Sequence, residues 1–388
     1  MDFTQFGEHQ LDPFPGYERM REKAPVFHDE QSGSWHVFRY DDVQRVLSEH
    51  ATFSSRIGGE DPSGTGQLFA SSLITTDPPR HRQLRSLVTQ AFTPKAVDAL
   101  APRIAGLADE LLEGIAARGS ADLIRELAYP LPVIVISELM GIPAQDREHF
   151  KYWSDVIVSQ TRTGSTSEEH YATNSEMTEY FLALIEQRRS RPGKDLISNL
   201  LSAKIDGQNL TVPELLGFCS LLLVAGNETT TNLIGNAVLC LAESPGTIDR
   251  LRQEPALLPQ TIEEVLRFRS PVQSMYRVTV AGTTLGDERI PAGAPIVAWI
   301  GSANRDERQF QRPGEFDVDR GQNRHLAFGH GIHFCLGAPL ARLEARIALE
   351  ALLSRLPGLS LVEGANLERM ESTIVYGLKA LPVKWQPA

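Results

Sequence analysis

The spacing of apolar residues changes near residue 93, and the predicted secondary structure changes with it. Before that point, a Ser-Gly turn at residues 32–33 separates two short alternating segments, which predicts a β-hairpin. From Thr93 onward, apolar side chains recur every three or four residues, which predicts a helix over residues 93–119 that Thr93 caps. Helical patterns continue to about residue 270. Strands are then expected over residues 277–281, 294–300 and 372–376.

One predicted helix is apolar on nearly every side. It begins at Thr211, which forms a capping-box pattern with Glu214, and it continues through the apolar residues 215–224. A helix without a polar face belongs in the interior of a large protein. Since no regular alternation of strands and helices is visible, the chain is predicted to be mainly α with a smaller β portion, in the α+β class.

The composition indicates a globular chain and excludes several other classes. The 388 residues are 41% hydrophobic and 22% charged, which is ordinary for a globular protein. The 38 basic and 49 acidic side chains give a net charge of −11, so no nucleic-acid partner is expected. The apolar stretch at residues 215–226 is too short to span a bilayer, and no secretory signal is visible. We therefore expect a cytoplasmic protein without a membrane anchor.

Residues 328–337, with the sequence FGHGIHFCLG, carry the strongest chemical signal. Three glycines in ten positions indicate positive φ angles or close backbone approach. Such a loop can direct N–H groups at the Cys335 sulfur, and the helix-forming residues that follow would add the positive end of a helix dipole. Both features predict a stabilised thiolate.

Two other interpretations of the cysteine are open at this point. A free cysteine is usually a small buried hydrophobic residue. His330, His333 and Cys335 could also supply three ligands to a zinc ion, although no second cysteine or acidic ligand stands beside them.

The loop fits the pattern Phe-Gly-x-Gly-x-His-x-Cys-x-Gly from Phe328 to Gly337 without a mismatch. This pattern resembles the haem-binding loop of the cytochrome P450 family. The resemblance implies the P450 fold, with haem b between a long central helix and the helix after the cysteine loop. Cys335 would be the iron ligand, with Phe328, His333 and Gly337 also at the haem. A thiolate ligand donates electron density that favours O–O cleavage.

The segment Glu264-Val265-Leu266-Arg267 also matches the family. The resemblance places Glu264 and Arg267 in a buried ion network with Arg320, beneath the haem. Glu-x-x-Arg is not diagnostic alone, because it also occurs at residues 18–21 and 186–189, where ordinary helical pairs explain it.

Histidine and arginine lie one helical turn apart at His81 and Arg85. An exposed helical pair would be the simpler interpretation of these two residues alone. The resemblance instead implies that His81, Arg85, Arg277 and His333 bind the haem propionates. Two carboxylates inside a protein require cationic partners.

Residues 225–231 interrupt the apolar helix with polar side chains. Threonines that bond back to a preceding carbonyl would explain such a segment in structural terms. The resemblance implies that Glu228 and Thr229 relay protons beside the oxygen-binding face. It also implies that Gly226 leaves room for oxygen and Ala225 leaves room for substrate.

The implied activity is that of a monooxygenase, which inserts one oxygen atom of O2 into a lipophilic small molecule. The matching features run in family order, which implies one catalytic domain over residues 1–388 without a fused reductase. Electrons from NAD(P)H are then expected through a ferredoxin or flavodoxin and its reductase. Candidate residues for carrier binding are Arg80, Arg82, Arg342 and Arg346, although a solvated helix face explains them equally well.

The expected substrate is a fatty acid, terpenoid or steroid, with a macrolide or other secondary metabolite as an alternative. The apolar residues Ala225, Val272, Ile374 and Val375 are predicted to contact it, and Gln273 to orient a polar group. The resemblance places the pocket walls in residues 54–73, 152–170, 222–229, 272–275 and 373–377. A haem-thiolate peroxygenase, isomerase or nitric-oxide reductase, and a haem sensor without turnover, are rival functions.

Overall fold

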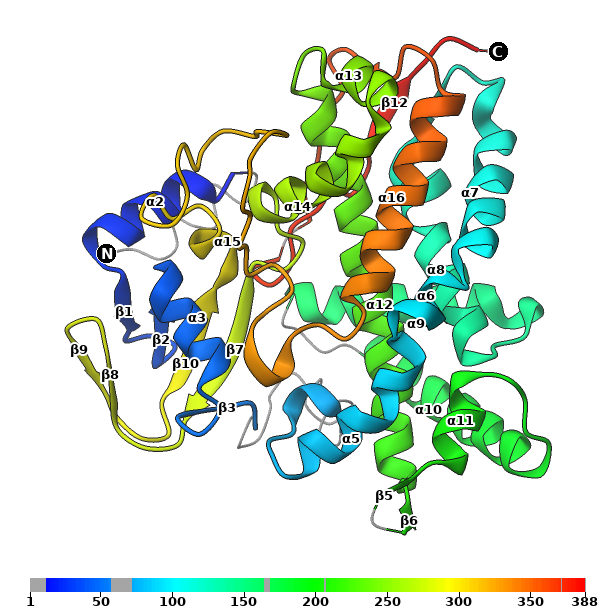
Figure 1. Ribbon diagram of the computed structural model, residues 1–388. Helices are drawn as coiled ribbons and strands as arrows, with labels where there is room; N and C mark the ends of the chain where they lie inside the picture. The colour runs from blue at the N-terminus through cyan, green and yellow to red at the C-terminus, as the bar shows by residue number, and fades with distance from the viewer. Residues whose placement is uncertain (1–11, 57–71, 164–167, 206, 371, 388) are drawn as a thin grey trace.

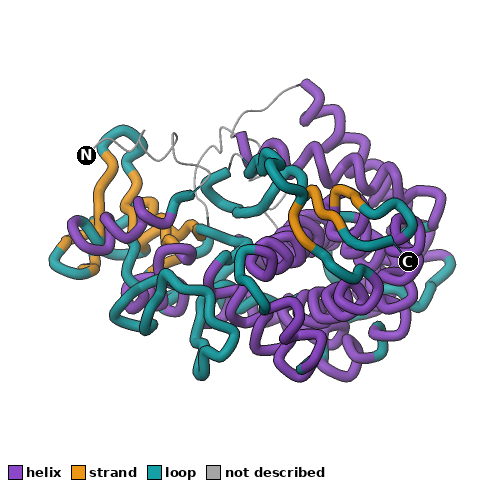
Figure 2. Tube along the Cα trace, turned by 90° about the horizontal axis from the view of Figure 1, so that it is seen from above, coloured by secondary structure: helices purple, strands orange, loops and turns teal. Residues whose placement is uncertain are grey.

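Helices form the larger part of the molecule, and the five-stranded sheet lies at one side of them (Figures 1 and 2). The computed structural model describes residues 12–56, 72–163, 168–205, 207–370 and 372–387. The α-helices are α2 (Phe14–Lys23), α3 (Tyr40–Ser48), α5 (Arg80–Thr89), α6 (Pro94–Asp98), α7 (Ala101–Ala116), α8 (Pro130–Met140), α9 (Arg147–Thr163), α10 (Glu168–Ser190), α11 (Leu196–Ser202), α12 (Val212–Ala242), α13 (Thr247–Gln253), α14 (Leu258–Phe268), α15 (Ile300–Ala303) and α16 (Ala338–Arg355).

The five-stranded sheet has the order β1-β2-β10-β7-β3, in which β10 runs parallel to β2 and the other neighbours are antiparallel. The predicted hairpin is confirmed, and Gly33 in its turn has a φ of 69°. The strands are β1 (Val26–Asp29), β2 (Ser34–Val37), β3 (Phe53–Ser54), β4 (Ser120–Asp122), β5 (Lys204–Ile205), β6 (Gln208–Asn209), β7 (Ser274–Thr279), β8 (Thr283–Leu285), β9 (Glu288–Ile290), β10 (Pro295–Trp299), β11 (Ser360–Leu361) and β12 (Pro382–Lys384).

The long helix α12 passes through the centre of the helical region, beside α16 and α8 (Figure 1). The predicted capping box is present, because the Thr211 side chain accepts from the Glu214 N–H and the Glu214 carboxylate accepts from the Thr211 N–H. Most α12 residues are buried, and the buried apolar side chains among them belong to a single cluster that also includes residues of α7, α8, α14 and α16. The prediction of a central apolar helix is therefore confirmed.

The helix predicted over residues 93–119 is interrupted. Thr93 caps α6 as expected, since its hydroxyl accepts from the Ala96 N–H, but α6 ends at Asp98 and α7 begins at Ala101. Pro102 accounts for the break, because in a continuous helix its ring would clash with the carbonyl of Asp98 and it has no N–H to donate.

Two predicted strands match β7 and β10, but the third is wrong. Residues 372–376 contribute only an isolated bridge between Val375 and Val272. The Ser372 hydroxyl accepts from the N–H groups of Ile374 and Val375, which bends the chain into a turn. Within the described residues, no helix has the length and apolarity required to cross a bilayer.

Candidate haem-binding site

The cysteine loop, residues 328–337, leads into α16 and is held by its own backbone. The Cys335 N–H donates to the Phe328 carbonyl at 2.8 Å. Gly329 and Gly331 have φ angles of 73° and 69°, as the glycine spacing predicted. At Gly331 a Cβ would also lie 2.8 Å from the Cα of Ser48 in α3. Glycine is therefore required there by backbone conformation and by close packing.

The Cys335 side chain has an exposed face, so it is not a buried hydrophobic residue of the core. The N–H groups of Gly337 and Ala338, at the beginning of α16, donate toward the sulfur. Desolvation by the surrounding protein has the larger effect and raises the pKa of the thiol, although these N–H groups and the guanidinium groups of Arg85 and Arg342 lower it. The loop alone does not produce the predicted thiolate; a metal cation at the sulfur would be needed.

His330 and His333 do not join Cys335 as metal ligands. The His333 Nε2 lies 2.9 Å from the Ser55 hydroxyl, and the His333 ring centroid lies 4.3 Å from that of His81. In the part of the chain that the structure describes, no three His, Cys, Asp or Glu side chains form a metal-binding group. The zinc interpretation is therefore wrong.

Basic side chains from separate elements converge beside the loop. His81 of α5 and Arg277 of β7 are 2% and 5% exposed. Burial lowers the pKa of His81 to about 4 and that of Arg277 to about 10. The His81 Nε2 is buried and has no hydrogen-bond partner among the residues that the structure describes. Asp77 is the carboxylate that acts on both residues, so the group carries more basic than acidic side chains.

Arg85 lies in this group but also supports the loop. Its guanidinium donates to the carbonyls of Ile332 at 2.9 Å and Phe334 at 2.6 Å. A guanidinium has five N–H donors, so these bonds leave donors for a further acceptor. The buried His81 nitrogen, the cationic donors and the accessible cysteine together fit a flat ligand with two carboxylates and a metal. Haem is such a ligand.

The polar segment of α12, residues 225–231, is mostly buried or partly buried. Ala225 is exposed although most of the helix is buried, and the Thr229 hydroxyl donates to the Ala225 carbonyl at 2.7 Å. Thr229 thus makes the backbone bond that a structural interpretation predicted. Glu228 is 6% exposed. A Cβ at Gly226 would lie 3.4 Å from Ile136 of α8. Glycine here allows close helix packing, and its role in leaving room for oxygen stays a prediction.

The structure brings Glu264, Arg267 and Arg320 together. Both Glu264 oxygens accept from Arg267 at 2.8 Å, and the Arg320 Nε lies 2.9 Å from Glu264 Oε2. Arg267 is fully buried and also donates to the carbonyls of Asn304 and Pro313. This network joins α14 to the segment that precedes the cysteine loop.

Among the predicted substrate contacts, the role predicted for Gln273 is wrong. Its side chain is 2% exposed, its amide nitrogen donates to the Ser270 carbonyl at 2.6 Å, and its amide oxygen accepts from the Tyr17 hydroxyl at 3.1 Å. These bonds fix Gln273 in the core, so it does not orient a substrate. Val272 and Val375 pair through the isolated bridge, with Ile374 partly buried beside them. Residues 57–71 and 164–167 of the predicted walls lie outside the described residues.

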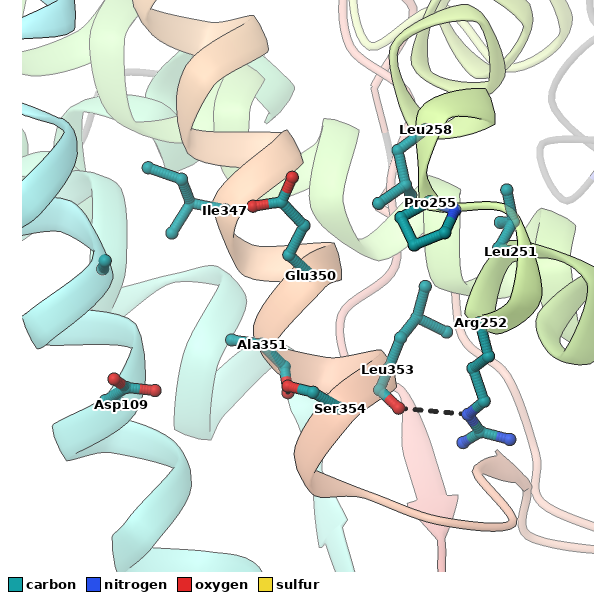
Figure 3. A pocket seen from close by; sticks show the side chains of 11 residues that line it. Asp109, Leu251, Arg252, Pro255, Leu258, Ile347, Glu350, Ala351, Leu353 and Ser354 are labelled. Carbon is teal, nitrogen blue, oxygen red and sulfur yellow. Dashed lines mark hydrogen bonds between the residues drawn. The ribbon is translucent and has the colours of Figure 1, made fainter.

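A surface groove of about 530 Å³ lies elsewhere, between α7, α13 and α16 (Figure 3). At one side of it the Arg252 Nε donates to the Leu353 carbonyl at 3.0 Å. Its lining includes none of the predicted site residues: Ala105, Asp109, Leu251, Arg252, Pro255, Leu258, Ile347, Glu350, Ala351, Leu353 and Ser354.

Sequence reasoning missed two carboxyl groups near these elements. Asp77 accepts from the Ser55 N–H at 3.1 Å and interacts with His81 and Arg277. Its place directly before the predicted His81 helix was an available signal. Glu263 pairs with His325 and Arg342 on either side of the cysteine loop, and only its adjacency to Glu264 could have indicated it.

Comparisons with known proteins agree with this site. The family described as Cytochrome P450 matches residues 23–385. The chain is 46% identical over 378 residues to the cytochrome P450 YjiB of Bacillus subtilis strain 168, covering 96% of this chain and 93% of that protein. It is 42% identical over 374 residues to the erythromycin C-12 hydroxylase of Saccharopolyspora erythraea, covering 94% of this chain and 92% of that protein.

Among solved structures, CYP109E1 of Bacillus megaterium in complex with testosterone matches with a TM-score of 0.91 and 45% identity. The match covers 98% of this chain and 99% of that one. The family implies a haem-iron cofactor, which the residues around Cys335 fit. The matched length, the identity and the architecture agree, and the chain belongs to the cytochrome P450 family of monooxygenases.

Proposed function

We propose that this cytochrome P450 binds haem b through Cys335 and inserts one oxygen atom of O2 into a lipophilic small molecule. The observation that carries the proposal is the convergence of an accessible cysteine with the buried basic side chains of His81 and Arg277. When bound, haem would supply the oxygen-activating chemistry.

The chain's own residues would hold the cofactor on two sides. Cys335 would ligate the iron, and His81, Arg85, Arg277 and His333 would bind the propionates. Binding a carboxylate favours the charged form of a histidine, so His81 would gain the partner that its buried Nε2 lacks. Phe328 and Gly337 lie at the two ends of the loop and would also contact the haem. A Cβ at Gly337 would lie 4.0 Å from the cysteine sulfur, so the glycine lies directly beside the proposed iron ligand.

Glu228 and Thr229 of α12 would deliver the protons that the reaction consumes. The Thr229 hydroxyl proton is directed to the Ala225 carbonyl, which leaves the oxygen lone pairs of Thr229 to accept a hydrogen bond from the open side of α12. Glu228 directly precedes Thr229 in α12, is buried and would replace the protons that leave this position.

The substrate is proposed to be a polycyclic lipophilic molecule such as a steroid. Ala225, Val272, Ile374 and Val375 offer apolar contacts, and Gln273 is not available to a polar substituent. The complex of CYP109E1 with testosterone supports a steroid, whereas the erythromycin hydroxylase supports a macrolide.

Electrons are proposed to arrive from a ferredoxin or flavodoxin that an NAD(P)H-dependent reductase reduces. Of the arginines considered for carrier binding, Arg80 pairs with Glu214, Arg342 with Glu263 and Arg346 with Glu350. Arg82 is exposed and keeps its charge available to an acidic carrier.

Turnover with a surrogate ferredoxin and reductase tests this function. With testosterone, NAD(P)H and isotopically labelled dioxygen, a hydroxylated product should carry one labelled oxygen atom. A steroid that shifts the haem spin state without product would indicate a sensor, and product made only from added peroxide would indicate a peroxygenase. A macrolide and a fatty acid, tested in parallel, discriminate among the substrate classes.

A further inference from the structure

Two consecutive carboxylates of α14 have different partners. Glu264 belongs to the buried network with Arg267 and Arg320. Glu263 faces the cysteine loop instead, where its two oxygens bind one residue before the loop, His325, and one after it, Arg342.

His325 connects Glu263 to the beginning of the loop. Its Nε2 lies 3.1 Å from Glu263 Oε2, and its Nδ1 lies 3.2 Å from the Ala327 backbone nitrogen and accepts that N–H. Because Nδ1 accepts, Nε2 carries the proton and donates to the carboxylate. The side chain of His325 is only 4% exposed, so this chain of bonds is held in one arrangement.

Arg342 connects Glu263 to the other side of the loop. Its Nε lies 2.6 Å and its Nη2 lies 2.8 Å from the two Glu263 oxygens, which is a bidentate pair. The guanidinium also stacks over the Phe328 ring, 4.5 Å from the ring centroid. Phe328 provides the carbonyl that accepts from the Cys335 N–H, so Arg342 contacts the residue that fixes the cysteine backbone.

The charge of Glu263 is maintained by these partners. Burial opposes its ionisation, but the hydrogen bonds from Arg342 and His325 outweigh burial and lower the pKa of Glu263 to about 2. The negative charge is thus present at neutral pH and lies against the Arg342 cation, which acts electrostatically on the Cys335 sulfur.

We propose that Glu263 is a positioning residue for the haem thiolate: it braces both sides of the cysteine loop and partly neutralises the Arg342 cation near the sulfur. The proposal rests on the proposed function, because the sulfur is taken to ligate the haem iron. It also means that Arg342 serves the loop and not the binding of an electron carrier. Residues around a metal ligand tune the metal in this way.

If Glu263 partly neutralises the Arg342 cation, two substitutions should have opposite effects on the haem reduction potential. Glu263→Gln leaves the Arg342 cation without its counter-charge, and a more positive environment favours the reduced iron, so the potential should rise. Arg342→Gln removes the cation, so the potential should fall. Glu263→Asp keeps the charge and should restore a value near that of the unmodified protein. Equilibrium redox titration measures all three.

The matched control is Glu350→Gln, because Glu350 also pairs with an arginine of α16, Arg346, at 2.8 Å. Its potential should not change. Shifts of the same sign in Glu263→Gln and Arg342→Gln, or no shift beyond that of the control, would overturn the neutralising role of Glu263.

The role of Glu263 in bracing the loop is measured on the haem-loaded protein. Amide hydrogen exchange over residues 325–335 should be faster in Glu263→Gln than in the unmodified protein and unchanged in Glu350→Gln. Equal exchange in Glu263→Gln and in the control would reject the bracing role. If Cys335 is not the haem ligand, the CO spectrum of the unmodified protein will show this, whereas the exchange result will still report on the loop.

Discussion

At the residue scale, a buried carboxyl group without a partner makes stability depend on pH. Glu344 of α16 is 2% exposed, and in the described part of the chain its Oε2 makes no hydrogen bond. Burial raises its pKa from 4.5 to about 8. The folded protein therefore holds a proton that the unfolded chain releases, and the stability from this group is lost as the pH rises from 4.5 toward 8.

Glu344→Gln should remove this dependence. Relative to the unmodified protein, the variant should gain stability with rising pH, by up to about 1.4 kcal/mol per pH unit over that interval. Urea unfolding at about pH 5 and about pH 8 measures the free energy of unfolding at both ends of this range. The same difference at both pH values would show that Glu344 is ionised in the folded protein.

The hydroxyl of Thr229 is predicted to matter for coupling and not for substrate binding. Thr229→Ala should keep the substrate-induced spin shift, but product formed per NAD(P)H consumed should fall by about tenfold or more, with peroxide released instead. Thr229→Ser, which keeps a hydroxyl, should retain most of the coupling. Quantifying product, peroxide and NAD(P)H in the same reaction tests this, and unchanged coupling in the alanine variant would exclude the role.

At the scale of elements, substitutions at the adjacent α12 positions 225 and 226 should affect different properties: Gly226→Ala the stability, and Ala225→Leu the binding of substrate. The missing side chain of Gly226 faces Ile136 of α8 at an ordinary contact distance, and alanine favours a helix more than glycine. Gly226→Ala should therefore raise the free energy of unfolding by about 0.5–1 kcal/mol and leave CO binding to the reduced protein unchanged.

Ala225→Leu is the matched variant, because Ala225 is accessible. It should weaken the spin shift caused by a bulky substrate. If Gly226→Ala impairs CO binding instead, the glycine lies against the ligand and not against α8.

The connection between α14 and the segment before the cysteine loop depends on Glu264. Removing this carboxylate leaves Arg267 and Arg320 buried without their charge partner, so Glu264→Ala should lose about 3–5 kcal/mol of stability and yield little haem-loaded protein. Glu186→Ala removes an exposed helical pair with Arg189 and should lose at most about 0.5 kcal/mol. Haem content and urea unfolding of both variants compare the two sites; normal haem loading in Glu264→Ala would refute the assignment.

Helices, loops and turns could be predicted from the sequence where residues close together in the chain determine the local structure. The cap of α12 depends on Thr211 and Glu214, which are three residues apart. The positive φ angles of the cysteine loop occur at glycines, which the sequence shows directly. The break before α7 depends on Pro102, a local signal that the apolar periodicity concealed. The turn at residues 372–376 depends on hydrogen bonds that the Ser372 hydroxyl accepts from the Ile374 and Val375 N–H groups and that compete with strand formation. The residue pattern alone did not distinguish a turn from a strand.

At the scale of the whole molecule, the unpredicted features are those that join distant segments. The amide of Gln273 is occupied by Tyr17, 256 positions away, so its sequence neighbours could not show that it faces the core. Glu263 meets Arg342 only because α14 packs against α16. The candidate site residues around Cys335 could be proposed from sequence because their motifs are local, whereas their hydrogen-bond partners come from other elements.

The carbon monoxide difference spectrum of the reduced, haem-reconstituted protein tests the ligation of iron by Cys335 most directly. The unmodified protein should show the long-wavelength absorbance band of a thiolate-ligated haem, and Cys335→Ala should lose it. An imidazole-type spectrum in the unmodified protein, or a thiolate-type band that persists in Cys335→Ala, would contradict the proposed site.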